Sequence, residues 1–281
     1  MIDILEKNEN EIKQENLLDT LLKKSNSKTN YEDFSVLILN NENEQNFSEK
    51  EMFGVTGLNY IKNAVNVCDY KVVNFNNEDV IKVIKTNMGN KKFVAVVFSD
   101  TPLLTKQTFL EILDYFIYKD LCALKFNRGY VFECEYLRSV EKVYNPQVQN
   151  FNEEDFLKVN SSESFSKALN VLKNRILNYH FSNNVIIKSP ETTFIDAEVN
   201  IEKNVIIEPF TVIKGKSIIK SKTVIENSTV FNAIIHENCK ITNSNLNTCV
   251  IKPNCVIEDY SVIKNTTIEE NSIISNKEIR G

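Results

Sequence analysis

The feature that most constrains the fold of this chain is a six-residue spacing of isoleucines that begins after residue 180. Six of them follow one another at intervals of six without a break, and these are Ile195, Ile201, Ile207, Ile213, Ile219 and Ile225. Steps of five or six then continue the pattern through Val230, Ile235, Ile241, Leu246, Ile251, Ile257, Ile263, Ile268 and Ile274. An α-helix repeats about every 3.6 residues and a strand about every two, so neither element alone produces this spacing.

A hexapeptide period is typical of a β-solenoid, in which three short strands form one triangular coil and successive coils stack. We expect the isoleucines to point inward and to stack on their equivalents in the coils above and below. A small or β-branched residue follows most of them four places later and is expected at the corners of the coil: Val199, Val205, Thr211, Ser217, Thr223, Thr229, Cys239, Cys255, Ser261, Thr267 and Ser272. The flat outer faces of such a prism pack readily on one another, so we also expect a symmetric homotrimer.

Before residue 180 the chain alternates between segments typical of strands and segments typical of helices. We expect strands at 36–39, 71–75 and 93–98, helices at 58–67, 77–85 and 103–118, then a strand at 131–132 and a helix at 162–178. This alternation predicts a parallel sheet with helices on its faces. Residues 1–24 have the pattern of an imperfect amphipathic helix, and residues 25–30 have the composition of a linker.

The composition narrows the functional classes. The formal net charge is -5 and Lys and Arg do not cluster, so nucleic acid is not expected as a partner. No apolar run approaches the roughly 20 residues that cross a bilayer, so no membrane association is expected. Six cysteines are scattered without a CxxC pair, beside only two histidines, which argues against a zinc site and favours a reducing cytoplasm.

The segment that joins the two halves, LKNRILNYHFSNNVIIKSPETTFIDAEVNIEKNVIIEPFTVIKG, resembles one family in particular. It is similar to the junction of the bacterial N-acetylglucosamine-1-phosphate uridyltransferase / glucosamine-1-phosphate acetyltransferase family. The matching positions are Arg175, His180, Pro190, Thr193, Ile195, Asp196, Pro209 and Gly215. In the first half, VAVVFSDTPLLTKQTF, FNRGYVF and KVNSSESFSKALNVLKNRI resemble segments of the same family.

The resemblance implies a fold and a domain order. It predicts an α/β nucleotidyltransferase-like domain with a linker helix over residues 31–180, after the N-terminal helical extension and linker that the sequence pattern gives for residues 1–30. That domain is Rossmann-like with a trimmed parallel sheet, and a left-handed parallel β-helix follows over residues 181–281. The similarity runs from about residue 35 to the end of the printed sequence.

The chemistry that the resemblance implies is uridyl transfer from UTP to N-acetylglucosamine 1-phosphate with Mg²⁺, giving UDP-N-acetylglucosamine and pyrophosphate. By the matched motifs, Asp100 and Asn160 would supply oxygen ligands to the metal, as Mg²⁺ prefers. Asn127 and Gly129 would contact the sugar. Lys50 would neutralise the nucleotide phosphates and counts as the catalytic residue.

Each of these residues also has a purely structural interpretation. Asp100 stands before a predicted helix and would serve there as an N-cap, and Asn160 stands before the next helix in the same way. Lys50 lies in a charged run that suits a solvated surface. The tripeptide 127–129 has the composition of a turn.

Several departures from the family pattern weaken the catalytic interpretation. NNENEQNF stands where the family has a glycine-rich phosphate loop, and Glu42 and Glu44 would repel a triphosphate. The Q..LGTGHA motif is absent, and no acetyltransferase activity is expected. The alternative is therefore a catalytically inactive trimeric scaffold or regulator that acts through its β-helix. We expect His236 to point outward, and His180 to end the linker helix with a partial positive charge.

Overall fold

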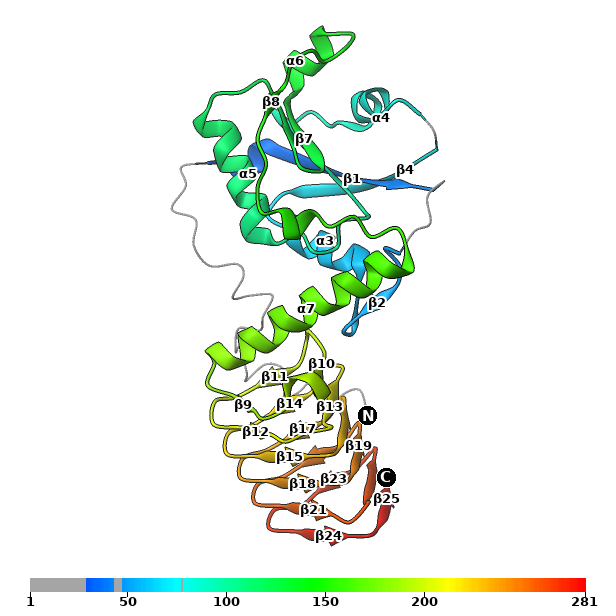
Figure 1. Ribbon diagram of the computed structural model, residues 1–281, viewed down its shortest axis with the longest axis vertical. Helices are drawn as coiled ribbons and strands as arrows, with labels where there is room; N and C mark the ends of the chain where they lie inside the picture. Colours follow the sequence, from blue (N-terminus) through cyan, green and yellow to red (C-terminus); the bar gives the residue numbers. More distant parts are fainter. Residues whose placement is uncertain (1–28, 43–46, 77) are drawn as a thin grey trace. The chain divides into compact units, whose positions relative to one another are not determined.

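The computed structural model describes residues 29–42, 47–76 and 78–281. The helix expected over residues 1–24 lies outside the described residues, as does most of the expected linker. The described chain divides into two compact units, and the division falls between Leu172 and Lys173. That point lies inside helix α7 (Ser162–Ser182), so the helix contributes residues to both units (Figure 1).

The first unit is built on a six-stranded sheet whose strand order is β4-β1-β5-β7-β6-β8. Strands β4 (Asp69–Phe75), β1 (Phe34–Asn41) and β5 (Phe93–Phe98) run parallel, with β1 in the middle. This confirms the three strands and the parallel pairing that the alternating pattern predicts. After β1 the chain forms β4 on one side of it and then β5 on the other side. The strand order of the sheet therefore reverses between β1 and β5.

The other half of the sheet differs from the all-parallel expectation. Strand β7 (Gly129–Glu133) runs antiparallel to β5 and to β6 (Ala123–Phe126), and β8 (Gln147–Val148) adds to β6 in parallel. The reason is the two-residue connection between β6 and β7, since so short a turn joins only antiparallel strands. The strand expected near residues 131–132 is confirmed as part of β7.

Helices cover both faces of the sheet. One face packs on α3 (Gly57–Val65) and α5 (Lys106–Tyr118), and the other on α4 (Val80–Asn87) and α6 (Cys134–Ser139). Side chains of β5 alternate between the two cores, with Ala95 and Val97 in one and Val94 and Val96 in the other. A strand buried on both faces needs an unbroken apolar run, which explains the composition of FVAVVF.

Two short features were not anticipated from the sequence. Strands β2 (Glu51–Met52) and β3 (Val55–Thr56) form a hairpin just before α3. Its turn residues Phe53 and Gly54 both have positive φ, at 50° and 81°. That conformation matches the right-handed twist of a two-residue hairpin. Three 3-10 turns were not anticipated either: η1 (Tyr31–Asp33) and η2 (Glu153–Phe156) in the first unit, and η3 (Pro190–Thr192) between β9 and β10 in the first coil of the β-helix.

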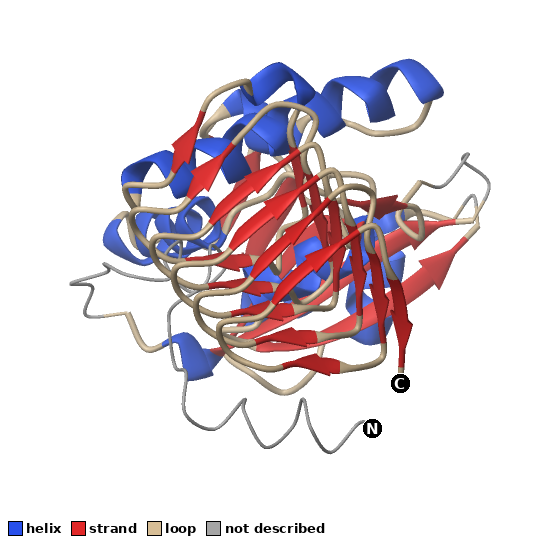
Figure 2. Ribbon diagram, turned by 90° about the horizontal axis from the view of Figure 1, so that it is seen from below, coloured by secondary structure: helices blue, strands red, loops and turns tan. Residues whose placement is uncertain are grey.

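The second unit is a left-handed parallel β-helix made of three sheets (Figure 2). One sheet contains β10 (Phe194–Ile195), β13 (Val212–Lys214), β16 (Thr229–Phe231), β19 (Asn245–Asn247), β22 (Val262–Lys264) and β25 (Glu278–Arg280). The next contains β11 (Asn200–Ile201), β14 (Ile218–Ile219), β17 (Ile234–Ile235), β20 (Val250–Ile251) and β23 (Thr267–Ile268). The third contains β9 (Ile186–Ile187), β12 (Ile206–Ile207), β15 (Val224–Glu226), β18 (Lys240–Thr242), β21 (Val256–Glu258) and β24 (Ile273–Ser275).

The apolar period of the sequence forms the core of this unit. All fifteen positions of the pattern are buried, with exposed fractions between 0% and 7%. Each pairs with its equivalent in the next coil, as Ile207 does with Ile225 and Ile225 with Ile241. The prediction that these side chains stack inward is therefore confirmed.

The corner residues are buried as expected at all but one of the places where the next core residue follows six positions later, and they are exposed at two places where it follows five positions later. Thr211, Ser217 and the others before a six-residue step are buried, except Ser272, which is only half-buried, whereas Thr229 and Thr267 are exposed. A shorter step moves the residue by one place, which turns its side chain to the outer face of the strand. Ser228, two residues before Val230, takes the buried position instead.

The turns of the β-helix explain its many asparagines. Ten of them have φ between 42° and 65°: Asn184, Asn204, Asn227, Asn232, Asn238, Asn243, Asn254, Asn265, Asn271 and Asn276. After glycine, asparagine tolerates this left-handed conformation best. Equivalent asparagines also bond between coils, since Asn238 Nδ2 donates to Asn254 Oδ1 at 2.8 Å and Asn254 Nδ2 donates to Asn271 Oδ1 at 3.2 Å.

Candidate functional site

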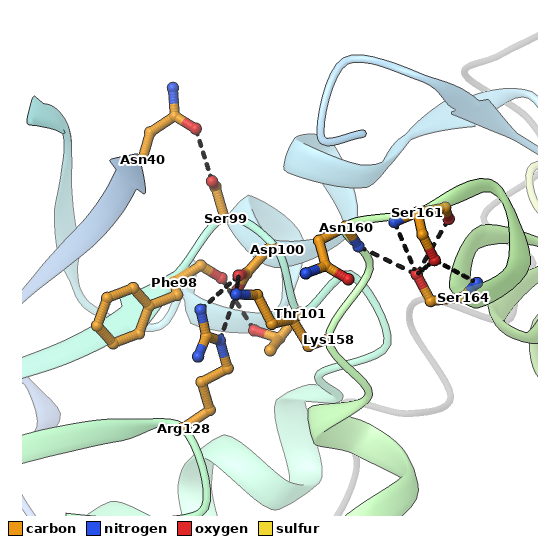
Figure 3. Close-up of polar contacts among 10 residues, drawn as sticks. All are labelled: Asn40, Phe98, Ser99, Asp100, Thr101, Arg128, Lys158, Asn160, Ser161 and Ser164. Carbon is orange, nitrogen blue, oxygen red and sulfur yellow. Dashed lines mark hydrogen bonds and ion pairs between the residues drawn. The ribbon is translucent and has the colours of Figure 1, made fainter. Parts of the chain in front are cut away.

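The candidate site lies at the carboxyl edge of the sheet, where the strand order reverses between β1 and β5. Ligands of open α/β sheets bind outside such an edge. The edge is tied together by Asn40 of β1, whose Oδ1 accepts a hydrogen bond from Ser99 Oγ at 2.7 Å (Figure 3). On its other side, Asn40 Nδ2 donates to Asn74 Oδ1 of β4 at 3.0 Å.

Asp100 follows β5 directly and is held at this edge by a tight turn. The backbone N–H and the hydroxyl of Thr101 both donate to the carbonyl of Phe98, at 3.3 and 2.9 Å. The N-cap of α5 is Thr105, whose Oγ1 accepts from Thr108 N at 3.2 Å. The interpretation of Asp100 as an N-cap is therefore wrong, because the helix begins several residues later.

The carboxylate of Asp100 is bound by an arginine. Arg128 Nε donates to Asp100 Oδ1 at 2.7 Å, and Arg128 Nη2 donates to Asp100 Oδ2 (Figure 3). The guanidinium carbon lies 4.8 Å from the centre of the Phe98 ring, within the range of a cation–π contact. Lys158 Nζ is 3.9 Å from Asp100 Oδ2. The side chains of Asp100, Arg128 and Lys158 are 17%, 28% and 34% exposed, so this group is in contact with solvent.

The segment between β8 and α7 brings Lys158 and Asn160 to the same edge. Val159 N donates to the carbonyl of Asp100 at 2.8 Å, which places both neighbours of Val159 beside Asp100. Upstream, the buried Asp155 accepts hydrogen bonds from Thr105 Oγ1 at 2.9 Å and from Thr108 Oγ1. This carboxylate fastens the segment to the start of α5 and so acts as a positioning residue for the site.

Asn160 is exposed and stands just before α7. Its backbone N donates to Ser164 Oγ at 3.1 Å, while Ser161 Oγ accepts from Ser164 N at 3.1 Å. The side chain that caps the helix is therefore that of Ser161, and the interpretation of Asn160 as the cap is wrong. Asn160 is exposed and lies near Asp100 (Figure 3), and its role as a metal ligand stays a prediction.

Asn127 and Gly129 have structural tasks at the β6–β7 turn. Asn127 Oδ1 accepts from Phe151 N at 2.7 Å and its Nδ2 donates to Phe151 O at 3.3 Å, which pins the segment after β8 to the turn. A Cβ on Gly129 would lie 2.3 Å from the carbonyl oxygen of Val96. The tripeptide 127–129 thus contains a turn, as its composition indicates, and the sugar contacts of both residues stay predictions.

The region of the expected phosphate loop is only partly described, because residues 43–46, and with them Glu44, lie outside the described residues. Glu42 N donates to Phe75 O at 3.2 Å, and Glu42 Oε2 accepts from Asn76 Nδ2 at 2.8 Å. The chain therefore leaves β1 alongside the end of β4. Lys50 is exposed, and its ammonium has no hydrogen bond or ion pair with any residue in the described part of the chain.

The residues at this edge do not fit a Mg²⁺ ion in the arrangement described. Mg²⁺ needs oxygen ligands around it, and both oxygens of Asp100 already accept from a guanidinium while an ammonium lies nearby. Across residues 29–42, 47–76 and 78–281, no group of three or more His, Cys, Asp or Glu side chains is placed to hold a metal.

The two histidines differ in their surroundings. His236 follows the core position Ile235 and points outward with its side chain 37% exposed, as expected. His180 is 1% exposed near the end of α7, and burial lowers the pKa of its imidazole to about 4. The expected partial positive charge on His180 is therefore wrong, because desolvation outweighs any attraction to the helix end. Its Nδ1 has no hydrogen-bond partner among the described residues.

Sequence reasoning missed Arg128, Lys158 and Asp155. A signal for Arg128 was present, because FNRGYVF carries an arginine inside a predicted turn. A charge placed in a two-residue turn at the edge of a sheet is a candidate for the site. Lys158 and Asp155 could not be placed at the site from the sequence, since their positions depend on how the segment after β8 folds back.

The fold and the site together define a Rossmann-like α/β unit joined to a left-handed parallel β-helix. No family model matches the chain, and no curated protein matches it. Among solved structures it is similar to a cytidylyltransferase from Leptospira borgpetersenii serovar Hardjo-bovis (strain JB197). The TM-score is 0.40 at 12% sequence identity, over 51% of this chain and 88% of that chain. A similarity at this level carries no argument about substrate or activity. No helix in the described part of the chain has the length and apolar character needed to cross a membrane.

Proposed function

We propose that the α/β unit is a sugar-1-phosphate nucleotidyltransferase-like domain that binds the phosphates of a nucleotide at the carboxyl edge of its sheet. The observation that supports this most is the meeting of Asp100, Arg128 and Lys158 beside the point where the strand order reverses. Two cationic side chains surround one carboxylate there, so the group attracts anions. The open edge of an α/β sheet is also where such folds bind their ligands.

The reaction proposed for this site is the transfer of a uridyl group from UTP to N-acetylglucosamine 1-phosphate. An oxygen of the sugar phosphate attacks the α-phosphorus, and pyrophosphate leaves. The protein must align the two reactants and offset their negative charge. Lys158 and Arg128 supply positive charge at the edge, and Lys50 is the further cation that the resemblance assigns to the phosphates.

We expect any such transfer to be slow. The chain beyond β1 has Glu42 bound to Asn76 beside the edge, where the resemblance leads one to expect glycine amides around the phosphates. The side-chain amide of Asn127 is engaged with the backbone of Phe151. Fewer groups are therefore free to hold the reactants in line.

Nucleotide binding is tested by the melting temperature of the full chain with and without UTP. Binding to the folded state alone raises the melting temperature, and we expect a rise that Lys158→Met reduces. Lys167→Met is the matched control, because Lys167 pairs only with the exposed Glu163 on α7 among the described residues. Pyrophosphate release with UTP and sugar phosphate then measures transfer. The absence of any UTP-dependent rise would contradict the proposal.

A second function, a non-catalytic trimeric scaffold, is favoured by one outer face of the β-helix. The sheet that begins with β9 presents a column of outward side chains in successive coils: Ile186, Ile206, Val224, Lys240, Val256 and Ile273. All but Lys240 are apolar, and Ile186 and Ile273 are 51% and 73% exposed. A mostly apolar column of this kind suits contact with another copy of the chain.

The scaffold is tested by light scattering coupled to size exclusion. We expect a trimer, and we expect Val224→Glu to shift it toward monomer because a charge would be buried in the interface. Asn245→Glu on a different outer face is the control and should leave the trimer intact. A monomeric wild-type chain would rule this function out.

A further inference from the structure

Arg128 is held in place more firmly than a surface arginine. It occupies one of the two positions of the β6–β7 turn, between Asn127, which is bonded to the backbone of Phe151, and Gly129, which is packed against the Val96 carbonyl. Its guanidinium lies over the Phe98 ring and makes a two-point contact with Asp100. Turn, ring and carboxylate thus fix the position of one positive charge.

This charge lies where a metal ion would have to bind. An arginine–carboxylate fork uses both oxygens of the acid and is among the strongest polar contacts in proteins. A divalent ion approaching Asp100 would compete with the fork and would be repelled by Arg128 and by Lys158, 3.9 Å from Oδ2. No other acidic cluster in the described part of the chain offers an alternative.

We propose that Arg128 is the resident cation of this site, so that the chain needs no divalent metal at Asp100. The identity of the anionic ligand depends on the proposed function, whereas the place of the cation does not. Asp100 then serves to hold the guanidinium at the carboxyl edge, where Arg128 and Lys158 together face an incoming phosphate. Arg128 and Lys158 act through their charge and position, and no covalent bond is made or broken when the phosphate binds.

The experiment is a titration of the full-length chain with Mn²⁺ alone, followed by electron paramagnetic resonance of the free ion. We expect wild type to show no Mn²⁺ binding that depends on Asp100, so wild type and Asp100→Asn should give the same curve. Arg128→Met frees the carboxylate and should bind Mn²⁺ more tightly than wild type, an increase that the added substitution Asp100→Asn removes. Arg128→Lys keeps the charge and is the matched control, expected to stay without Mn²⁺.

Two results would overturn the inference: wild-type binding of Mn²⁺ that Asp100→Asn abolishes, or failure of folded Arg128→Met to bind Mn²⁺ more tightly than wild type. Circular dichroism checks the fold of each variant, and the wild-type curve decides the matter even if Arg128→Met does not fold. Failure of the proposed function shows separately, as the absence of a UTP-dependent rise in melting temperature. If UTP does raise the melting temperature, EDTA should leave that rise unchanged, and a loss of the rise in EDTA would also overturn the inference.

Discussion

The two units of this protein place their decisive side chains in opposite ways. In the β-helix each core residue stacks on an equivalent residue one coil away, as Ile235 does on Ile251. Every coil repeats the same contact, so the pattern is visible as a period in the chain. In the α/β unit, Asp100 meets Arg128 from a turn 28 residues later, and nothing repeats. A repeated contact produces a periodic pattern from which the structure can be predicted. A single contact between residues far apart in the sequence produces no such pattern.

The largest expected effect comes from breaking the repeat at its centre. Ile225 is fully buried between Ile207 and Ile241, so Ile225→Ala should lower the free energy of unfolding by about 2–5 kcal/mol through lost burial and the cavity left behind. Urea unfolding followed by circular dichroism measures the change. Val224→Ala, one residue earlier and facing outward, should cost at most about 1 kcal/mol. Equal losses of unfolding free energy in the two variants would show that the stack of Ile207, Ile225 and Ile241 does not form the core.

The next effect concerns His180, the buried histidine of the second unit. Its folded pKa of about 4 lies below the ordinary value of 6.5, so the folded state prefers the neutral imidazole. Its contribution to stability is fully present above about pH 6.5 and is lost as the pH falls toward 4, amounting to roughly 3 kcal/mol.

The measurement is the difference in unfolding free energy between wild type and His180→Phe, followed from pH 7 to pH 4. This difference cancels the titration of the carboxylates that both proteins share. His236→Gln is the control, because the imidazole of His236 contacts solvent in the folded state. A difference that stays flat with pH would refute the assignment.

A smaller effect is expected where the α/β unit depends on a close approach. Gly129→Ala would place a Cβ 2.3 Å from the Val96 carbonyl oxygen, and we expect a loss of about 1–3 kcal/mol as β7 shifts from β5. Gly89→Ala is the matched control, since its Cβ would meet nothing within 4 Å. Melting temperatures of the two variants suffice, and the structural role of Gly129 is refuted if they agree.

The smallest effect concerns one turn of the β-helix. Asn254 has φ of 60° and bonds to Asn238 and Asn271 in the neighbouring coils. Asn254→Ala loses these bonds and also strains the turn, whereas Asn254→Gly loses only the bonds. We therefore expect Ala to be less stable than Gly by about 1 kcal/mol in thermal unfolding. The reverse order would mean that the turn is not under conformational constraint.

The fold was predictable to a large extent, and the reasons differ by element. FVAVVF had to be a strand buried on both faces because no solvent-facing position interrupts it. The antiparallel direction of β7 was harder to predict from the sequence, since it follows from the length of the β6–β7 turn. The corners at Thr229 and Thr267 were assigned to the wrong face because a five-residue step shifts the alternation of a strand by one.

The candidate site was predictable only as a location. Asp100 and Asn160 were paired from the sequence only through the resemblance, which assigns both of them to one metal site. The partner of Asp100 could not be predicted, because the choice among capping, metal binding and an ion pair depends on which charged side chain the fold brings close to the carboxylate. Arg128 reaches it, and the helix α5 takes its cap from Thr105 instead.

The sequence by itself determined the β-helix, because a hexapeptide period has few other ways to bury an isoleucine in every sixth position. It also determined the βα alternation and the edge of the sheet at which polar residues gather. Only the tertiary structure decided what that edge contains, namely a guanidinium fixed on Asp100 and a segment fastened by Asp155. It also decided, in the other unit, that the imidazole of His180 is buried away from water. The physical reason is that burial patterns are local and periodic, whereas the pairing of single charges depends on distances that exist only after the chain has folded.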